Sequence, residues 1–341
     1  MSKRVALIGL GMVAGTHVES IETSDRMSLE AVCGRDAQKA RVFAQGLSRP
    51  PRVFASPNEI EDVDFAILAT PPDAREEIVA TLVERGIPIL MEKPIERTLK
   101  AATRLIEICE QANVPLGIVL QHRFRPAAIE LRRRLTELGT IAAVEIAVPW
   151  WRPQSYYDAP GRGTYARDGG GVLVNQAIHT LDLALTFMPP VARVTATLRT
   201  TTQHDMEAED FATLALDFAD GAVGHVVATT AAYPGATETI VLHGTNGSAR
   251  LVGNALTLAF HDGREEAFGE SGGTGGGTGG GADPMAFTSD WHRAVIEDFA
   301  DALDENRPPA ITGRDALAVH RLIDAATRSS REGRALMMEV A

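Results

Sequence analysis

The chain has 341 residues, of which 45% are hydrophobic and 23% charged, a composition typical of a folded protein with two domains at this length. Its 45 acidic and 33 basic side chains give a formal net charge of −12, which argues against nucleic acid as the main partner because phosphate binding needs a positive surface. Two cysteines are too few for a disulfide framework or a zinc cluster, and no stretch approaches 18 uninterrupted apolar residues. We therefore expect a cytoplasmic protein with no metal site and no membrane partner.

Short apolar runs alternate with helical patterns over the first 120 residues. The runs typical of strands are 5–8, 29–33, 65–69, 88–91 and 116–120, and the helical patterns between them are 14–21, 37–45, 74–85 and 99–112. This alternation implies βαβ units on a parallel sheet. The sequence predicts an α/β, doubly wound domain over residues 1–121.

The pattern changes after residue 140. Longer strands are predicted at 141–150, 191–202, 211–218, 222–230, 237–243 and 256–260, and Asp220-Gly221 is a hairpin signal between two of them. Helical patterns lie at 171–188, 288–305 and 314–331. We expect residues 122–341 to form an α+β domain with a large, mostly antiparallel sheet. Nine of the 31 glycines fall in 269–281, which we interpret as a flexible loop.

The first predicted strand is followed by a phosphate-loop pattern, Gly9-Leu10-Gly11-Met12-Val13-Ala14. In such a loop the first glycine permits the tight turn, the second lets the backbone approach a pyrophosphate, and the alanine allows close packing of helix on strand. The start of the following helix offers N–H groups to the phosphates. The position directly between a strand and a helix favours dinucleotide binding over an ordinary turn.

The end of the second predicted strand bears on the choice of cofactor. An acidic residue there would bind the ribose 2′-hydroxyl of NAD, but the sequence has Gly34 and Arg35. Glycine leaves room for a 2′-phosphate and arginine can pair with it, which favours NADP over NAD. Alternatively, Arg35 is a solvated side chain in a turn and Asp36 caps the next helix.

Four further motifs resemble those of the glucose–fructose oxidoreductase, inositol dehydrogenase and rhizopine catabolism (Gfo/Idh/MocA) family. They are Ala69-Thr70-Pro71, Met91-Glu92-Lys93-Pro94, Arg123-Phe124-x-Pro126 and the run from Gly169 to Asp182. With the phosphate loop, the resemblance extends from about residue 3 to residue 335. It implies a Rossmann domain followed by an open-faced sheet domain. It also implies NAD(P)-dependent oxidation or reduction of a sugar, cyclitol or related polyol, and homodimers or homotetramers that associate through the C-terminal sheet.

Within this resemblance, Thr70, Pro71, Glu92 and Lys93 join the phosphate loop as candidate cofactor-binding residues. Lys93 follows a strand, and its ammonium can stabilise a developing alkoxide; the family match implies that the Lys93–Pro94 peptide bond is cis.

The candidate proton acceptor is His179, because imidazole titrates near neutrality. Asn175 precedes it by four residues, so the two would share one helix face. Many family members carry Asp at this position, but Asn cannot act as a base, although it can bond a substrate hydroxyl or the imidazole. Asp182 either orients the imidazole or makes another buried polar contact.

A cluster of aromatic residues between 150 and 165 is the candidate wall of the substrate pocket, or alternatively a subunit arm or ordinary loop packing. Aromatic faces stack on sugar C–H groups, and Arg and Tyr supply donors for hydroxyls. The candidate substrate residues are Arg123, Trp151, Arg162, Tyr165, Asn175 and His179.

Two other segments are interpreted as solvated surface. Arg75 is expected on a helix surface with no cofactor role, and the run 204–210 is expected to be a solvated acidic loop. The function predicted is hydride transfer by an NAD(P)-dependent enzyme. The alternative is a non-catalytic NAD(P)-binding sensor on the same fold.

Overall fold

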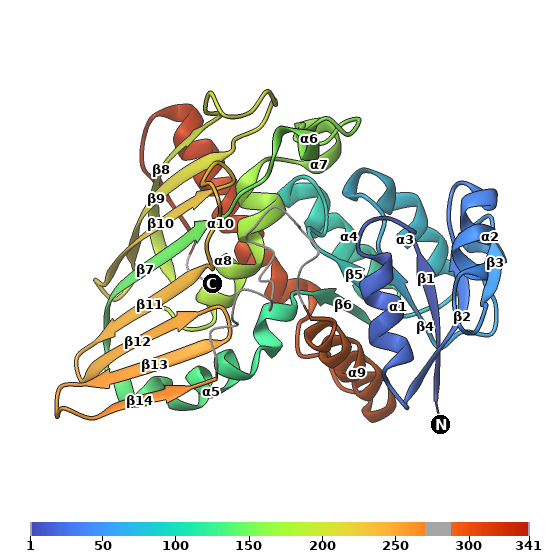
Figure 1. The fold of residues 1–341 in the computed structure, drawn as a ribbon, viewed down its shortest axis with the longest axis horizontal. Helices are drawn as coiled ribbons and strands as arrows, with labels where there is room; N and C mark the ends of the chain where they lie inside the picture. The colour runs from blue at the N-terminus through green and yellow to red at the C-terminus, as the bar shows by residue number, and fades with distance from the viewer. Residues whose placement is uncertain (1, 270–287, 340–341) are drawn as a thin grey trace. The chain divides into compact units, whose positions relative to one another are not determined.

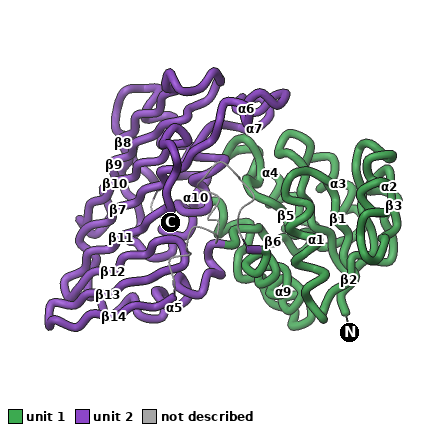
Figure 2. Tube along the Cα trace, in the orientation of Figure 1, with its two compact units in different colours: residues 1–121, 289–317 green, residues 122–288, 318–341 purple. Residues whose placement is uncertain are grey.

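The computed structural model describes residues 2–269 and 288–339, and its chain divides into two compact units, coloured separately in Figure 2. Unit 1 contains residues 1–121 and 289–317, and unit 2 contains residues 122–288 and 318–341. The first segment of unit 1 ends at Gln121, which is the boundary predicted from the sequence. Residues 289–317 group with unit 1, whereas they are predicted from the sequence to lie in the second domain. Apart from Gly269, the glycine-rich tract lies outside the described residues.

Unit 1 is built on a six-stranded parallel sheet, counted over the described residues, with the strand order β3-β2-β1-β4-β5-β6. The strands are β1 Lys3–Ile8, β2 Met27–Cys33, β3 Arg52–Phe54, β4 Phe65–Leu68, β5 Ile89–Glu92 and β6 Leu116–Val119. The helices are α1 Ala14–Glu22, α2 Ala37–Gln45, α3 Arg75–Glu84, α4 Leu99–Gln111 and α9 Asp290–Glu305 (Figure 1). This is the doubly wound arrangement that binds dinucleotides at the carboxyl edge of the sheet, and it confirms the predicted fold class.

The return of α9 to unit 1 has a clear packing cause. Phe299 of α9 lies edge-on to Phe65 of β4, with 5.3 Å between the ring centroids. At its start, the Ser289 carbonyl accepts a hydrogen bond from Ser20 of α1, at 3.1 Å. The helical pattern in the sequence defines an apolar face but does not say which sheet that face covers.

Unit 2 contains, over the described residues, a nine-stranded sheet with the order β14-β13-β12-β11-β7-β10-β9-β8-β15. β7 and β10 pair in parallel, and the other neighbours pair antiparallel. The strands are β7 Ile141–Pro149, β8 Val191–Arg199, β9 Phe211–Phe218, β10 Val223–Thr229, β11 Thr239–Gly244, β12 Gly247–Val252, β13 Ala255–Phe260, β14 Glu265–Phe268 and β15 Leu336–Met337. The helices are α5 Pro126–Arg134, α6 Gln154–Tyr157, α7 Tyr165–Asp168 and α8 Ile178–Leu185, and α10 Gly313–Glu332 runs from unit 1 into unit 2.

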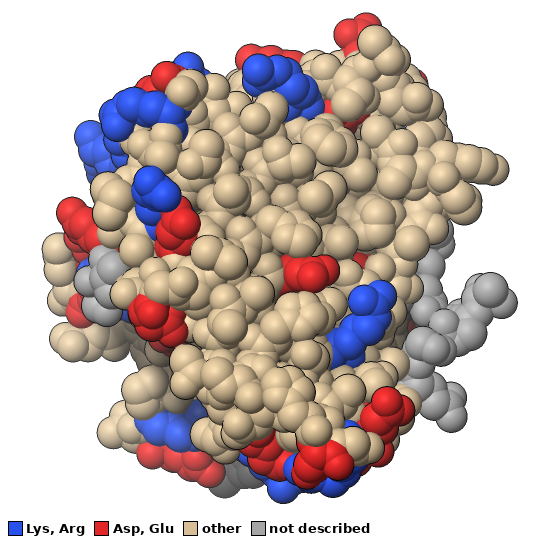
Figure 3. Space-filling view, turned by 90° about the vertical axis from the view of Figure 1, so that its left-hand side faces the viewer, with Lys and Arg blue, Asp and Glu red and all other residues tan. Residues whose placement is uncertain are grey.

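Alternation along the strands of unit 2 separates a buried face from an open one. On β10, Val226 and Ala228 are fully buried, whereas Val223 is 53% and Val227 is 36% exposed. Charged side chains are sparse across the middle of this open face and gather near its rim (Figure 3). This alternation of buried and exposed side chains is expected for an antiparallel sheet that helices cover on one side only.

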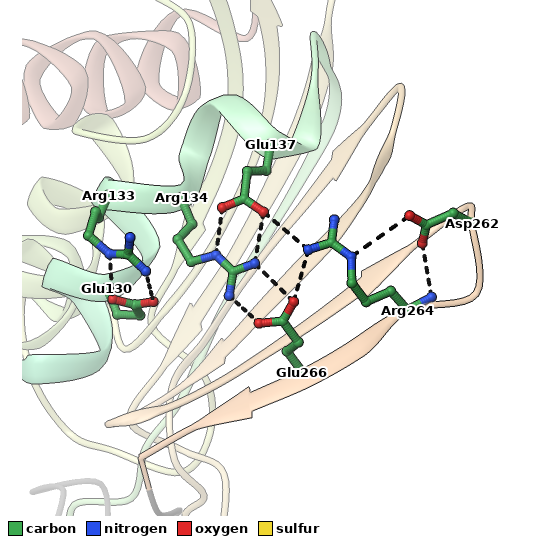
Figure 4. Close-up of polar contacts among 7 residues, drawn as sticks. All are labelled: Glu130, Arg133, Arg134, Glu137, Asp262, Arg264 and Glu266. Atoms are coloured by element: carbon green, nitrogen blue, oxygen red, sulfur yellow. Dashed lines mark hydrogen bonds and ion pairs between the residues drawn. The ribbon is translucent and has the colours of Figure 1, made fainter.

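The edge strand β14 is tied to the end of α5 by a network of alternating charges (Figure 4). Arg134 bonds both Glu137, at 2.7 Å, and Glu266 of β14, while Arg264 reaches the same Glu266 at 3.0 Å. The hydrogen bond from Arg134 is the main reason that the pKa of Glu137 is lowered to about 2. β14 is the outermost described strand at its end of the sheet, so only one side of its backbone pairs with a neighbouring described strand. The network of charges fixes the position of this edge strand.

No helix among the described residues has the length and apolar character that a membrane span requires.

Candidate active site

The phosphate loop turns directly from β1 toward α1, and its first glycine is sterically required. Gly9 has φ +98°, and a Cβ atom there would lie 2.7 Å from the carbonyl carbon of Ala69 and from the nitrogen of Thr70. Its N–H donates to the Cys33 carbonyl at 2.9 Å. The loop is therefore pressed against the segment that follows β4, at the edge where the ends of β1, β2 and β4 meet.

The second glycine borders open space. A Cβ atom built on Gly11 meets no atom of the described residues within 4 Å, so the loop backbone at this point can be approached by a ligand. Close by in the fold, Thr70 follows β4, and its buried Oγ1 has no hydrogen-bond partner among the described residues. A buried unsatisfied hydroxyl calls for an additional partner. An open glycine loop and an orphaned donor at one sheet edge fit a bound dinucleotide, which the rest of the motif, Met12, Val13 and Ala14, would also line.

At the end of β2, the Arg35 side chain is exposed and the Asp36 side chain makes hydrogen bonds to the backbone. The Asp36 carboxylate accepts the N–H groups of Gln38 and Lys39, both at 3.0 Å, and so caps α2. Gly34 lies against Leu10, whose Cδ1 would be 3.4 Å from an added Cβ. Asp36 therefore has a structural role, and Arg35 is the charged side chain left at this strand end.

The residues after β5 are held by a buried polar cluster. The Lys93–Pro94 peptide bond is cis, as the resemblance implied. The Glu92 carboxylate contacts His17 of α1 at 2.9 Å and accepts the Lys93 N–H at 3.2 Å. Burial alone would raise the pKa of Glu92, but the hydrogen bond from His17 and the nearby charges outweigh it and lower that pKa to about 2. Glu92 is therefore ionised and directed into unit 1.

A second histidine completes this cluster. His292 of α9 lies 3.9 Å from the Glu92 carboxylate and edge-on to His17, with 5.5 Å between ring centroids. Burial lowers the pKa of His292 to about 3, so the ring is neutral at physiological pH. Sequence reasoning missed both histidines: His17 lies just beyond the phosphate loop, but nothing in the sequence links it to a residue so much further along the chain.

The prediction that Arg75 lies on a helix surface is wrong. Its side chain is 2% exposed, and its guanidinium donates to the carbonyl of Thr70. The physical reason is that the loops after β4 and β5 leave backbone carbonyls inside the unit, and those carbonyls require donors.

In unit 2, the predicted helix 171–188 begins differently from the expectation. Residues Leu173–Ala177 form a π-helical turn, and the α-helix α8 starts only at Ile178. The side-chain amide of Asn175 donates to the carbonyls of Gly170 and Gly171, at 2.8 and 3.1 Å. Asn175 thus stabilises the start of the helix. Asn175 lies in the π-helical turn and His179 lies in α8, so the two residues do not belong to one continuous α-helix.

Glu209 holds the backbone where this wider turn begins. Its buried carboxylate accepts the N–H groups of Gly171 and Leu173, at 3.0 and 3.2 Å. Burial raises the pKa of Glu209, and the backbone hydrogen bonds oppose that shift. Wider turns of this kind occur frequently at functional sites.

His179 is buried on α8 and packs on His122, with ring centroids 4.8 Å apart and planes tilted by 31°. Next to it in the chain, Thr180 has a buried Oγ1 without a partner among the described residues, and the same is true of Oε1 of Gln176. Sequence reasoning missed these two residues. Unsatisfied polar atoms beside a candidate base are consistent with a polar ligand at this helix.

Arg123 and Asp182 form a bidentate ion pair, with nitrogen–oxygen distances of 2.7 and 2.5 Å. Asp182 is fully buried, so its carboxylate is compensated by the guanidinium. Of the two roles considered for Asp182, this contact is the buried polar one. The guanidinium that the sequence analysis assigned to substrate is used at least in part within the unit.

The aromatic segment packs as a layer of rings. Trp151 lies edge-on to Tyr233 at 5.4 Å and is tilted over His204 at 6.0 Å. The Arg162 guanidinium lies 4.7 Å from the centroid of the Tyr156 ring, and its buried Nε lacks a partner among the described residues.

Tyr165 is 41% exposed, and desolvation raises the pKa of its hydroxyl, which therefore stays protonated at neutral pH.

The run 204–210 is not the solvated loop that was expected. His204 and Asp210 are buried, and their Nδ1 and Oδ2 atoms are 2.7 Å apart. The other ring nitrogen of His204 lies 2.8 Å from the Arg152 carbonyl. The segment folds back beneath the aromatic layer, which the acidic composition conceals. Within the described ranges, no group of three His, Cys, Asp or Glu side chains could hold a metal ion.

A parallel sheet with a glycine loop, a lysine at a neighbouring strand end and a separate mixed sheet defines a nicotinamide-dependent oxidoreductase of two domains. Comparison with known families agrees: residues 3–119 match the oxidoreductase family with an NAD-binding Rossmann fold, and residues 130–250 match the GFO/IDH/MocA C-terminal domain. The chain belongs to the Gfo/Idh/MocA family of oxidoreductases. The predicted family, fold class and enzyme class are confirmed.

Individual relatives match over nearly the whole chain. A D-apiose dehydrogenase of Paraburkholderia graminis is 26% identical, over 98% of this chain and 89% of its own. An inositol 2-dehydrogenase of Rhizobium meliloti is 24% identical, over 98% of both chains. The crystal structure of the WlbA dehydrogenase from Bordetella pertussis, in complex with NADH and UDP-GlcNAcA, is similar with a TM-score of 0.84, 27% identity and full coverage of both chains.

Proposed function

We propose that the enzyme transfers a hydride between a nicotinamide cofactor and a secondary alcohol or ketone of a sugar, cyclitol or related polyol. The observations that support cofactor binding are the open space at the Gly11 backbone and the buried Thr70 hydroxyl, which has no hydrogen-bond partner among the described residues. The substrate class is supported by relatives whose names denote dehydrogenases of D-apiose and inositol. A non-catalytic sensor is not favoured, since the family is one of oxidoreductases.

The bound nicotinamide supplies the hydride acceptor or donor, and the chain supplies the remaining groups. Lys93, at the end of β5, carries the cation that stabilises the developing alkoxide. His179 accepts the hydroxyl proton. The side-chain oxygen of Asn175 orients the substrate, while its amide nitrogen holds the backbone carbonyls of Gly170 and Gly171. Arg162, whose Nε has no partner within the described part of the chain, contributes a donor for a hydroxyl, with Trp151 and Tyr165 as stacking surfaces.

The test is turnover followed at 340 nm over a panel that includes D-apiose and myo-inositol. Replacing His179 with Ala should lower turnover by about 10²–10⁴-fold, the usual loss for a general base, and leave cofactor affinity unchanged. Lys93→Ala should also remove most turnover. Near-normal rates in His179→Ala would show that another group takes the proton.

We propose further that NADP is preferred over NAD. Its support is that Gly34 and the exposed Arg35 stand at the end of β2, where an acidic residue would bind the ribose of NAD; the cap that Asp36 makes on α2 is also what the alternative of a solvated Arg35 expects. Arg35→Ala should lower the affinity for NADPH and barely change the affinity for NADH. The control is Arg41→Ala, at an exposed position of α2, which should change neither affinity. Equal affinity of the wild-type enzyme for the two cofactors would contradict the proposal.

We also propose a homodimer or homotetramer that forms through the open face of the unit 2 sheet. Its support is the sparse charge of that face and the exposure of Val223 and Val227. Val227→Glu should reduce the mass measured by light scattering to that of a smaller species. A monomeric wild-type protein would refute this assembly.

A further inference from the structure

Arg75 places a positive charge inside unit 1, where every nitrogen of its guanidinium is used. Burying a charge costs free energy unless hydrogen bonds replace those to water. Nε and Nη2 donate to the Thr70 carbonyl at 3.1 and 2.7 Å. Nη1 donates to the carbonyls of Glu92 and Pro94, and to that of Ile95 at 3.3 Å. All the acceptors are backbone atoms, so Arg75 fixes the course of the chain.

These carbonyls belong to two loops at the same edge of the sheet. Thr70 follows β4, whereas Glu92 ends β5, the neighbouring strand in the parallel sheet, and Pro94 and Ile95 follow it. In a doubly wound sheet the halves on either side of the first strand bind the two halves of the dinucleotide. β2 lies on the adenosine side of β1, so β4 and β5 lie on the nicotinamide side. Arg75 therefore links the two loops that would border the reacting ring.

The peptide that joins Glu92 to Lys93 is held at both of its polar atoms. Its carbonyl accepts from Arg75, and its N–H donates to the Glu92 carboxylate at 3.2 Å. That carboxylate is itself held by His17, from the helix that follows the phosphate loop, at 2.9 Å. Rotation of this peptide would break both contacts, so the Cα of Lys93 has one well-defined position.

We propose that Arg75 is a positioning residue, which sets Lys93 against the nicotinamide by bonding the loops after β4 and β5 together. The inference rests on the proposed function, because it requires Lys93 to act at the site of hydride transfer. A displacement of about 1 Å from such a geometry can cost on the order of 10²-fold in rate. The guanidinium acts only through the backbone that it holds, and it contacts neither substrate nor cofactor in this role.

The experiment compares Arg75→Gln and Arg75→Lys with Arg85→Gln. Arg85 is the matched control, because it also donates to a loop carbonyl, that of Pro57 at 2.8 Å, but lies just beyond the other end of α3. Arg75→Gln should lower kcat roughly 10²-fold with little change in the KM for the polyol, and the primary deuterium isotope effect on kcat should rise because hydride transfer becomes slower. Arg75→Lys should recover part of the rate, and Arg85→Gln should match the wild type.

A second readout needs no turnover. ADP-ribose contains the adenosine, the pyrophosphate and the second ribose of NAD and lacks only the nicotinamide ring. Titrations of each variant with NADPH, NADH and ADP-ribose should show that Arg75→Gln lowers affinity for the complete dinucleotides several-fold more than affinity for ADP-ribose. A general loosening of unit 1 would weaken all three alike.

The outcomes separate the two proposals. Wild-type turnover in Lys93→Ala, or no turnover of the wild-type enzyme on any polyol, would refute the proposed function. The role of Arg75 would still be tested by the affinity ratio, which compares binding of the complete dinucleotides with binding of ADP-ribose. A folded Arg75→Gln protein with unchanged kcat, isotope effect and affinity ratio would overturn the inference. If Arg75→Gln does not fold, the same measurements are made on Arg75→Lys, which keeps the buried charge but offers fewer donors. Unchanged kcat, isotope effect and affinity ratio in Arg75→Lys would then overturn the inference.

Discussion

Gly9 and Gly11 belong to one motif, yet the structure predicts opposite consequences for replacing them with alanine. At Gly9 the added Cβ would lie 2.7 Å from backbone atoms of Ala69 and Thr70, and φ is +98°. The left-handed backbone costs an alanine roughly 1–2 kcal/mol, and overpacking adds about 1–3 kcal/mol. Gly9→Ala should therefore destabilise the free protein by about 2–5 kcal/mol, or roughly 4–20 °C in Tm for a unit of this size.

Gly11→Ala should instead leave the free protein almost unchanged. The new methyl group meets nothing within 4 Å, so the free energy of unfolding should shift by less than about 1 kcal/mol. The methyl group would, however, keep the pyrophosphate away from the backbone. Losing one charge-assisted hydrogen bond costs about 1.5–3 kcal/mol, which corresponds to roughly 10–100-fold in cofactor affinity.

Calorimetry of the free proteins and fluorescence titration with NADH and NADPH measure the two effects separately. The reasoning fails if Gly11→Ala binds the cofactors as tightly as the wild type, since the open space at the loop would then not be the phosphate site. It also fails if Gly9→Ala melts at the wild-type temperature, because the close approach to Ala69 would then carry no strain.

Two further predictions concern buried charge. The pKa of His292 is lowered from 6.5 to about 3 in the folded protein. Between these two pH values the unfolded chain binds a proton at this histidine and the folded protein does not. The free energy of unfolding therefore falls as the pH drops from 6.5 towards 3. His292→Phe should flatten this dependence by at most about 1.4 kcal/mol per pH unit in urea unfolding, and an unchanged slope would contradict the burial argument. Asp182→Asn removes the fully buried carboxylate that pairs with Arg123, whose side chain is 13% exposed, and should lower the free energy of unfolding by about 3–5 kcal/mol. The control Asp217→Asn, at an exposed pair, should lower it by less than about 1 kcal/mol. Equal losses in those two variants would argue against the burial of the ion pair.

The parallel sheet of unit 1 was predictable because its strands are buried on both faces. Phe65 to Leu68 are all fully buried, and such strands appear in the sequence as unbroken apolar runs. The phosphate loop was equally clear, since its glycines lie directly between a strand and a helix. The hairpin at Asp220-Gly221 was correct as well: β9 and β10 pair antiparallel, and Gly221 has φ +93°.

Other features depend on partners that are distant in the sequence. Arg75 is buried because carbonyls about twenty residues further on require donors, and no local pattern reveals this. The backbone at Gly171 and Leu173, where the π-helical turn begins, is held by Glu209, which belongs to a segment whose composition suggests a solvated loop. Short edge elements such as β3 and β15 were missed because two or three residues do not establish a periodicity.

The discontinuity of unit 1 has a consequence for synthesis on the ribosome. The sheet formed by residues 1–121 is complete in its strands long before Ser289 is made, and at ordinary elongation rates the delay is about 10–30 s. During that interval Phe65 lacks the aromatic ring of Phe299 against which it finally packs. The nascent first domain therefore exposes an apolar patch until residues 122–288 of unit 2 have been made and α9 follows them. For the same reason, a domain exchanged between relatives or expressed alone needs residues 289–317 joined to residues 1–121 to close its own core.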